Sequence, residues 1–236
     1  MMENTLKEAR RCNAIYTITA PRSNAVLLSP AIQWYFVLDF ESTCFKDGPH
    51  PPEIIEFPVV ILNPTDGTVQ DQFRSFVRPT ENPVLSDFCS SLTGVRQDVA
   101  HADDLTAVLK EFELWLRIKK EQLGCRFRPS KSSTAIFVTW TDWDISTCLW
   151  DECRRKKIAV PNDILNRMDV KAVFQQWIRS NRAGQKWRGG LVDALQLVGL
   201  KFCGRPHCGI DDARNTARLL YHLLSKKAVP SCVVKS

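Results

Sequence analysis

Three short apolar segments follow one another closely and constrain the fold more than any other feature of this sequence. They cover residues 34–38, 54–62 and 69–77. Each is short and rich in β-branched or aromatic residues, which is typical of buried strands rather than helices. Residues 63–67 contain a proline and an Asp-Gly pair, which supply turn chemistry between the last two segments. The segments therefore predict an antiparallel meander.

Helical periodicity takes over in the rest of the chain. Ser86 is positioned to cap a short helix that Gly94 ends, and residues 105–123 carry the apolar stripe of a long amphipathic helix. Two further strands are predicted at residues 135–140 and 168–170. Further helices are predicted at residues 143–156, 171–182, 191–198 and 210–226. A meander followed by alternating strands and helices predicts an α/β sandwich built on one mixed sheet.

The length of 236 residues suffices for one substantial domain. We place this domain at residues 31–228, between a flexible basic segment at 1–30 and a tail at 229–236. The net charge is +6, so the long-range field should modestly attract polyanions.

Nine cysteines are scattered along the chain, and the first thirty residues do not resemble a secretory leader. An odd number of cysteines in such a chain favours reduced thiols. No apolar run approaches the roughly 20 residues that a membrane span needs. We therefore expect an intracellular protein, in the cytoplasm or the nucleus, with no membrane association.

Asp39 and Glu41 stand where the first apolar segment ends. Side chains alternate along a strand, so these two carboxylates share one face while Phe40 points to the other. Adjacent carboxylates repel each other and favour a compensating cation. Taken alone, such a pair is more often a solvent-facing feature of a strand end.

Asp142 and Asp144 follow the strand predicted at residues 135–140. This position is the carboxyl end of a strand, where open α/β sheets bind ligands. Either aspartate could instead cap the following helix, so the sequence leaves the choice between them open.

His207 lies in a loop bounded by Pro206 and Gly209, five residues before Asp212. Asp211 or Asp212 could simply complement the dipole of the last helix. A lone histidine in such a loop is also structural more often than catalytic.

In combination, these residues resemble the DEDDh exonucleases, whose fold is ribonuclease-H-like. The shared order is Asp-x-Glu on the first strand, Asp after a later strand, and His-x4-Asp at the last helix. Further motifs resemble the branch that trims histone mRNA, ribosomal RNA and small interfering RNA ends, including its compact Snipper-type members. They are residues 39–44 (DFESTC), 53–58 (EIIEFP), 88–89 with 92–94, 143–144 (WD) and 204–212 (GRPHCGIDD). The resemblance covers roughly residues 33–227.

The resemblance implies an α/β/α sandwich and a 3′-to-5′ exonuclease that releases nucleoside 5′-monophosphates. Asp39, Glu41, Asp144 and Asp212 would hold two Mg²⁺ ions, for which Mn²⁺ can substitute. Magnesium is a hard cation that prefers such oxygen ligands, and paired ions can grip both the attacking and the leaving oxygen. His207 would be the general base that takes the proton of the attacking water.

The same resemblance implies a binding site for the terminal nucleotide. Phe88 and Trp143 would stack on the base, although core packing is the alternative for both rings. Backbone around Phe40, Ser42 and Thr43, with Leu92, would hold or wedge the final sugar, and Thr93 would also contact substrate. No residue type in the sequence enforces recognition of a 2′-hydroxyl. We therefore expect single-stranded or 3′-overhanging RNA and DNA as substrates.

Two basic runs could follow the phosphate backbone of a substrate. The first, residues 154–157, is equally typical of a solvated helix end, because cations suit helix C-termini. The second, residues 186–188, lies beside the Gly189-Gly190 turn and is the better candidate.

Two alternatives to an RNA- and DNA-degrading exonuclease stay open: a DNA-restricted repair exonuclease and an inactive nucleic-acid-binding module. An inactive module typically lacks one of the carboxylates, whereas all four are present here. A complete site within one chain also predicts a monomer without an obligate protein partner.

Overall fold

The computed structural model describes residues 32–47, 50–127, 133–182 and 186–229. The predicted basic segment at residues 1–30 and residues 230–236 of the predicted tail lie outside this part of the chain. The strands are β1 (Trp34–Leu38), β2 (Glu41–Ser42), β3 (Ile54–Leu62), β4 (Val69–Phe76), β5 (Ala135–Thr139) and β6 (Arg167–Asp169). The α-helices are α2 (Asp87–Thr93), α3 (Leu105–Leu123), α4 (Trp150–Lys156), α5 (Val170–Asn181), α6 (Leu191–Leu197) and α7 (Gly209–Ser225).

The strands form one mixed sheet. β3 pairs antiparallel with both β1 and β4, whereas β5 lies parallel to β1 and β6 lies parallel to β5. The predicted meander and mixed sheet are therefore confirmed. β2, which the sequence analysis missed, continues along β3 beyond the end of β1, and the register shifts between Glu41 and Ser42.

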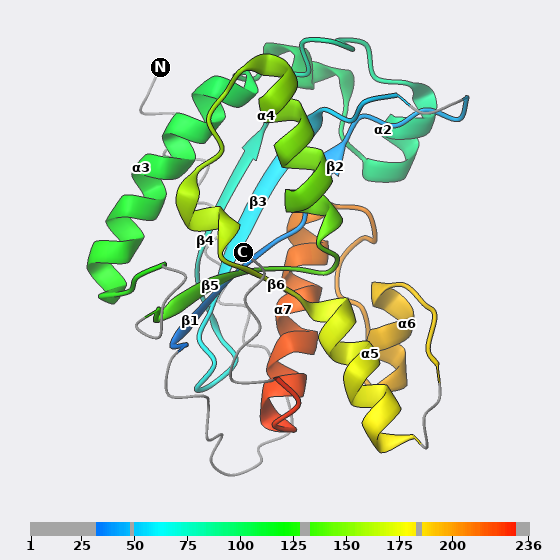
Figure 1. Ribbon diagram of the computed structural model, residues 1–236. Helices are drawn as coiled ribbons and strands as arrows, with labels where there is room; N and C mark the ends of the chain where they lie inside the picture. The colour runs from blue at the N-terminus through cyan, green and yellow to red at the C-terminus, as the bar shows by residue number, and fades with distance from the viewer. Residues whose placement is uncertain (1–31, 48–49, 128–132, 183–185, 230–236) are drawn as a thin grey trace.

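Helices cover both faces of this sheet. Phe36 and Leu38 of β1 pack in one apolar cluster, whereas Tyr35 and Val37 pack in the other, as the alternation along a strand requires. The first cluster is completed by α3 and α4, and the second by α5, α6 and α7. Figure 1 shows α5, α6 and α7 gathered on one side of the sheet and α3 on the other. The predicted α/β/α sandwich is thus confirmed.

Local capping explains where two of the helices begin and end. The Ser86 side chain accepts a hydrogen bond from Cys89 N at the start of α2, and Gly94 ends this helix in the left-handed conformation, at φ 74°. Asp104 caps α3 in the same way, and Gly124 ends it.

The helix predicted at residues 143–156 has two parts. Its first part is the π-helical segment η2 (Asp144–Leu149), and α4 continues directly from it. Such wide turns occur frequently at functional sites. None of the helices in the described part of the chain is both long and apolar enough to cross a bilayer.

Two residues of the basic run at 154–157, Arg155 and Lys156, are engaged in contacts within the protein. Lys156 pairs with two buried carboxylates, Glu53 at 2.8 Å and Glu152 at 2.6 Å. Arg155 binds Glu81 at 2.9 Å and donates to the Pro52 carbonyl at 2.6 Å. These contacts tie α4 to the start of β3, so they favour the helix-end interpretation over a role in binding substrate.

Candidate active site

Asp39 and Glu41 flank the break between β1 and β2. Phe40, between them, turns its side chain into the core, where its ring lies 4.6 Å from that of Phe57. Asp39 and Glu41 are half-buried. They lie on the face of the sheet that α7 covers, since Gly209, the first residue of α7, lies against both of them. The predicted division of these side chains between two faces is therefore found.

Asp144, and not Asp142, joins this pair. Asp144 is buried at the start of η2, where one carboxylate oxygen accepts a hydrogen bond from Phe40 N at 3.0 Å. Its carboxyl group is also hydrogen-bonded to that of Asp39. Asp142 instead forms an ion pair with Arg167 at 2.6 Å. This placement agrees with the choice of Asp144 that the family resemblance implied, whereas the residue pattern alone had left both aspartates open.

Asp212 completes the cluster from the first turn of α7. It is buried, and its carboxylate accepts hydrogen bonds from the backbone N–H groups of His207 and Cys208. The N-terminus of α7 can reach β1 because Gly209 has no side chain, since a Cβ atom there would stand 2.6 Å from the Asp39 carbonyl oxygen. This close approach places Asp212 beside Asp39.

The four carboxyl groups lie close enough together to affect one another's pKa values. Burial, followed by the charges of Asp144, Asp212 and Glu41, raises the pKa of Asp39 well above its ordinary value. Burial, followed by the charges of Asp212 and other acids, raises the pKa of Glu41 to about 8. Four acids from three separated segments therefore share one desolvated site, and the charge of each opposes the ionisation of its neighbours.

Burial also raises the pKa values of Asp144 and Asp212, each to about 7. Hydrogen bonds from the backbone partly offset the effect of burial. They come from the Phe40 N–H for Asp144 and from the His207 N–H for Asp212. Backbone hydrogen bonds therefore hold these two carboxylates in place. They do not offset burial enough to keep the carboxylates fully ionised at neutral pH.

The chemistry of this donor set fits a divalent cation. Among the described residues, no three potential ligand side chains form a ready-made metal-binding group, and the Asp39 and Asp144 carboxyls share a hydrogen bond instead. A hydrogen bond between two carboxyl groups requires that one of them be protonated. A bound cation would replace this proton and relieve the repulsion among the acids. Carboxylate oxygens are the ligands that Mg²⁺, Mn²⁺ and Ca²⁺ prefer.

His207 lies in the exposed loop before α7 and has a left-handed backbone, with φ 60°. Arg205 ties this loop to α2, because its guanidinium donates to the carbonyls of Ser91 at 2.5 Å and Leu92 at 3.1 Å. Gly94 leaves the room for that guanidinium, since a Cβ atom there would collide with it. The loop that carries the predicted base is thus anchored to the helix that carries Phe88.

Glu56 is a residue whose role the sequence analysis missed. It is buried on β3 and accepts hydrogen bonds from the backbone N–H groups of Gly209 at 3.1 Å and Ile210 at 3.2 Å. It also pairs with Arg74 at 2.8 Å. Glu56 therefore binds the N-terminus of α7, where a negative charge is favoured. A lone carboxylate inside an otherwise apolar strand was the available signal.

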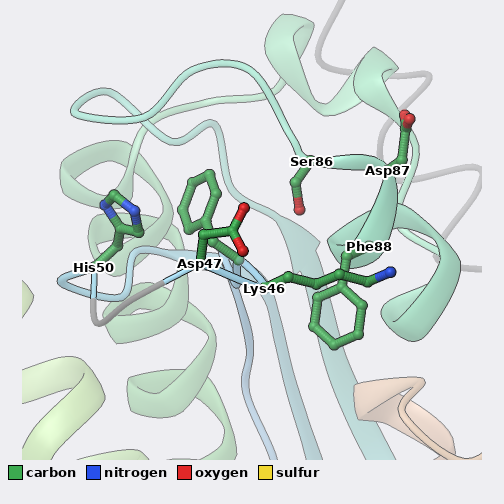
Figure 2. A pocket seen from close by; sticks show the side chains of 7 residues that line it. Lys46, Asp47, His50, Ser86, Asp87 and Phe88 are labelled. Carbon is green, nitrogen blue, oxygen red and sulfur yellow. The ribbon is translucent and has the colours of Figure 1, made fainter.

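Phe88 and Trp143, the predicted stacking residues, lie outside the buried core of the described residues. Phe88 is half-buried and Trp143 is 44% exposed. The Lys46 ammonium group lies 5.9 Å from the centre of the Phe88 ring. Figure 2 shows this pair at the edge of a cavity of about 380 Å³ between the segment after β2 and the start of α2. Both rings are therefore available for contact with a ligand.

The other predicted substrate-contacting residues divide into two groups, apart from Phe40, whose ring is buried in the core. Ser42 and Leu92 are half-buried beside the carboxylate cluster and α2. Thr43 and Thr93 are buried, and their hydroxyls are used within the protein: Thr43 accepts from Glu53 N at 3.0 Å, and Thr93 donates to the Cys89 carbonyl at 2.9 Å. The predicted contact at Thr43 is through the backbone and does not need this hydroxyl, so it stays a prediction, as does the contact of Thr93 with substrate.

Comparisons with known proteins agree with this geometry. Residues 36–220 match the exonuclease family RNase_T. The nuclease domain of 3′hExo, a DEDDh family member whose solved structure contains rAMP, has a TM-score of 0.74 and 30% identity, with 88% of this chain and 98% of that chain covered. The fold and the carboxylate cluster therefore define a nuclease of the ribonuclease-H-like class.

Curated relatives narrow this class. ERI1 exoribonuclease 2 of Xenopus laevis is 41% identical over 86% of this chain and 29% of its own length. The 3′-5′ exonuclease Snipper of Drosophila melanogaster is 33% identical over 88% of this chain and 75% of its own length. The chain thus belongs to the DEDDh 3′-5′ exonucleases of the ERI1 and Snipper type. It spans less than a third of the length of the Xenopus relative.

Proposed function

We propose that this chain is a divalent-metal-dependent exonuclease that removes nucleoside 5′-monophosphates from the 3′ ends of RNA and DNA. One observation carries the proposal: Asp39, Glu41, Asp144 and Asp212 come from three separated segments and form one partly buried cluster in which each pKa is raised. A family whose members depend on divalent metals provides the reason for such a cluster.

These four carboxylates would hold the metal, which we infer to be Mg²⁺ with Mn²⁺ able to substitute. When bound, the ions would activate water and offset the charge that develops on the leaving 3′ oxygen. His207 would accept the proton of the attacking water, a task that an imidazole side chain commonly performs as a general base. Glu56 and Arg205 would act as positioning residues by holding the two ends of the loop that carries His207.

Phe88 and Trp143 would stack on the terminal base, which suits an enzyme that tolerates any sequence because every base offers a π face. The names of several relatives specify exoribonucleases, and a solved structure of a similar 3′-exonuclease is described as recognising a histone mRNA stem-loop. These names support RNA as a substrate class. Snipper is named an exonuclease without that restriction, so we include DNA.

All the proposed catalytic side chains come from one chain, which supports action as a monomer. Seven cysteines in the described residues are free thiols, which supports a reducing compartment such as the cytoplasm or the nucleus.

Asp144 and Asp142 offer a matched pair of substitutions for testing this proposal. We expect Asp144→Asn to abolish digestion of a 5′-labelled RNA or DNA strand in Mg²⁺, because it removes a carboxylate from the cluster. Asp142→Asn removes a carboxylate two residues away that pairs with Arg167, so it should leave most of the activity. The products would be resolved over time on a denaturing gel.

The same experiment separates the alternatives. Digestion of DNA alone would identify a DNA-restricted exonuclease. If the unmutated chain bound the RNA strand and the DNA strand but cleaved neither, it would be identified as a binding module. Full activity of Asp144→Asn would exclude the proposed site.

A further inference from the structure

Phe76 is a large aromatic residue whose exposure the fold itself does not explain. It ends β4, and 42% of its surface is exposed, nearly the same fraction as for Trp143. It faces solvent rather than any of the apolar clusters of the described residues. An exposed aromatic ring beside a nuclease site is a candidate surface for base stacking.

The register of the sheet places Phe76 in one row with the carboxylate cluster. Glu41 of β2 pairs with Glu56 of β3, and Glu56 pairs with Phe76 of β4. Paired residues of neighbouring strands point to the same face, here the face covered by α7. Neighbouring strands are about 4.8 Å apart, so the backbone of Phe76 lies roughly 10 Å from that of Glu41.

A cation is fixed beside the ring. The guanidinium carbon of Arg74 lies 5.1 Å from the ring centre of Phe76. Arg74 is held there by its ion pair with Glu56 at 2.8 Å and by Cys208 Sγ at 3.9 Å, and 38% of its side chain stays exposed. The pair therefore adjoins the His207 loop and combines an aromatic face with a positive charge, the two features that bind single-stranded nucleic acid.

The pair also lies on the side of β3 away from the proposed binding site of the terminal nucleotide. The helix that carries Phe88 rests on the segment around β2, through contacts of Ser86 with Cys44 O and of Cys89 with Ser42 O. Phe76 is on β4, across β3 from β2. A strand with its 3′ base at Phe88 and its scissile phosphate near Glu41 can therefore continue across β3 to Phe76.

We propose that Phe76, supported by Arg74, stacks on a base of the single strand on the 5′ side of the scissile bond, a few nucleotides from the 3′ end. This inference rests on the proposed function, because the carboxylate cluster defines where the scissile bond lies. The ligand is single-stranded RNA or DNA of any sequence, since stacking requires only a base face and the cation favours the phosphate backbone.

Phe76→Ala tests the stacking site, because Arg74 also supports Glu56 and its loss would disturb α7. Binding of a fluorescein-labelled ten-nucleotide RNA would be measured by fluorescence anisotropy in EDTA, so that no cleavage is needed. We expect Phe76→Ala to weaken binding about five- to tenfold and Phe76→Trp to restore it. Leu114→Ala, which alters an exposed apolar residue on α3, is the matched control and should bind like the parent.

Hydrolysis in Mg²⁺ gives the second measurement. Phe76→Ala should raise KM for the ten-nucleotide strand by a similar factor, with kcat unchanged and with no effect on a dinucleotide too short to reach β4. Unchanged binding by Phe76→Ala, or an equal loss with Leu114→Ala, would overturn the stacking site. Failure of the parent chain to hydrolyse any strand would instead refute the proposed function, while the binding measurement would still decide the role of Phe76.

Discussion

The backbone of His207 adopts a conformation that few residues other than glycine tolerate. His207 follows Pro206 and has a φ of 60°. Its backbone N–H group donates a hydrogen bond to the Asp212 carboxylate. Non-glycine residues keep such angles only where the surrounding structure fixes them, often at functional sites. The backbone that carries the imidazole is thus held in part by the same carboxylate that is proposed to bind metal.

Replacing this side chain should affect chemistry more than metal binding. We expect His207→Ala to lower kcat by about 10²- to 10⁴-fold, because a general base is lost while all four carboxylates remain. Single-turnover rates measured across a Mg²⁺ titration would separate the two effects. His101→Ala, an exposed histidine outside the site, is the control. Equal turnover by mutant and parent would remove His207 from the role of base.

Local sequence patterns identified candidate site residues but could not choose between Asp142 and Asp144, and the choice of Asp144 came from the family resemblance. Asp142 and Asp144 are equally good helix caps by sequence, and only the fold brings Arg167 to one and Asp39 to the other. Glu56 was visible as part of a motif, but its role depends on the N-terminus of α7, about 150 residues later in the chain. Such choices depend on contacts between distant segments, which local patterns do not encode.

At the level of elements, the approach of α7 to β1 depends on Gly209. A Cβ atom at this position would stand 2.6 Å from the Asp39 carbonyl oxygen, and backbone cannot yield as a flexible side chain can. We expect Gly209→Ala to push the start of α7 outward, separating Asp212 from Asp39 and lowering kcat at least tenfold. Exonuclease assays, with circular dichroism to verify folding, would measure this.

Gly190→Ala provides the matched control. Gly190 also stands at the start of a helix, but a Cβ atom there would be 3.8 Å from the nearest atom, an ordinary contact. Activity of Gly209→Ala equal to that of Gly190→Ala would show that the close approach is not required.

Elements with a strong local pattern were predicted well. The bounds of β1, β3 and α3 match the apolar runs and the helical stripe residue for residue. β2 was missed because two residues carry no periodicity. The π-helical turn at Asp144–Leu149 was missed because its hydrophobic pattern resembles that of an ordinary helix. In both cases the fold departs from regular structure beside the carboxylate cluster.

Over the whole molecule, the cluster should make stability depend on pH. Glu41, Asp144 and Asp212 have pKa values near 7 to 8 in the folded chain, against about 4 in an unfolded chain. Between these values the folded state binds more protons than the unfolded state, so the free energy of unfolding from these groups falls as pH rises. The cluster is therefore most destabilising above pH 8 when no metal is bound.

A bound divalent ion should offset this loss most where the carboxylates are ionised. We expect Mg²⁺ to raise the Tm, measured against EDTA, by more at pH 8 than at pH 6. Differential scanning calorimetry at both pH values would measure the difference, and Asp144→Asn should reduce it. An equal rise in Tm at both pH values would contradict the assigned acidities.

Phe40 links the active site to the core, since its backbone N–H group donates to Asp144 and its ring packs against Phe57. A change in core packing that moves this ring would also move the backbone N–H group. Substitutions in the core near Phe57, which make no contact with a nucleotide, should therefore alter turnover. Packing of the protein interior thus determines the position of the catalytic carboxylate as well as the stability of the fold.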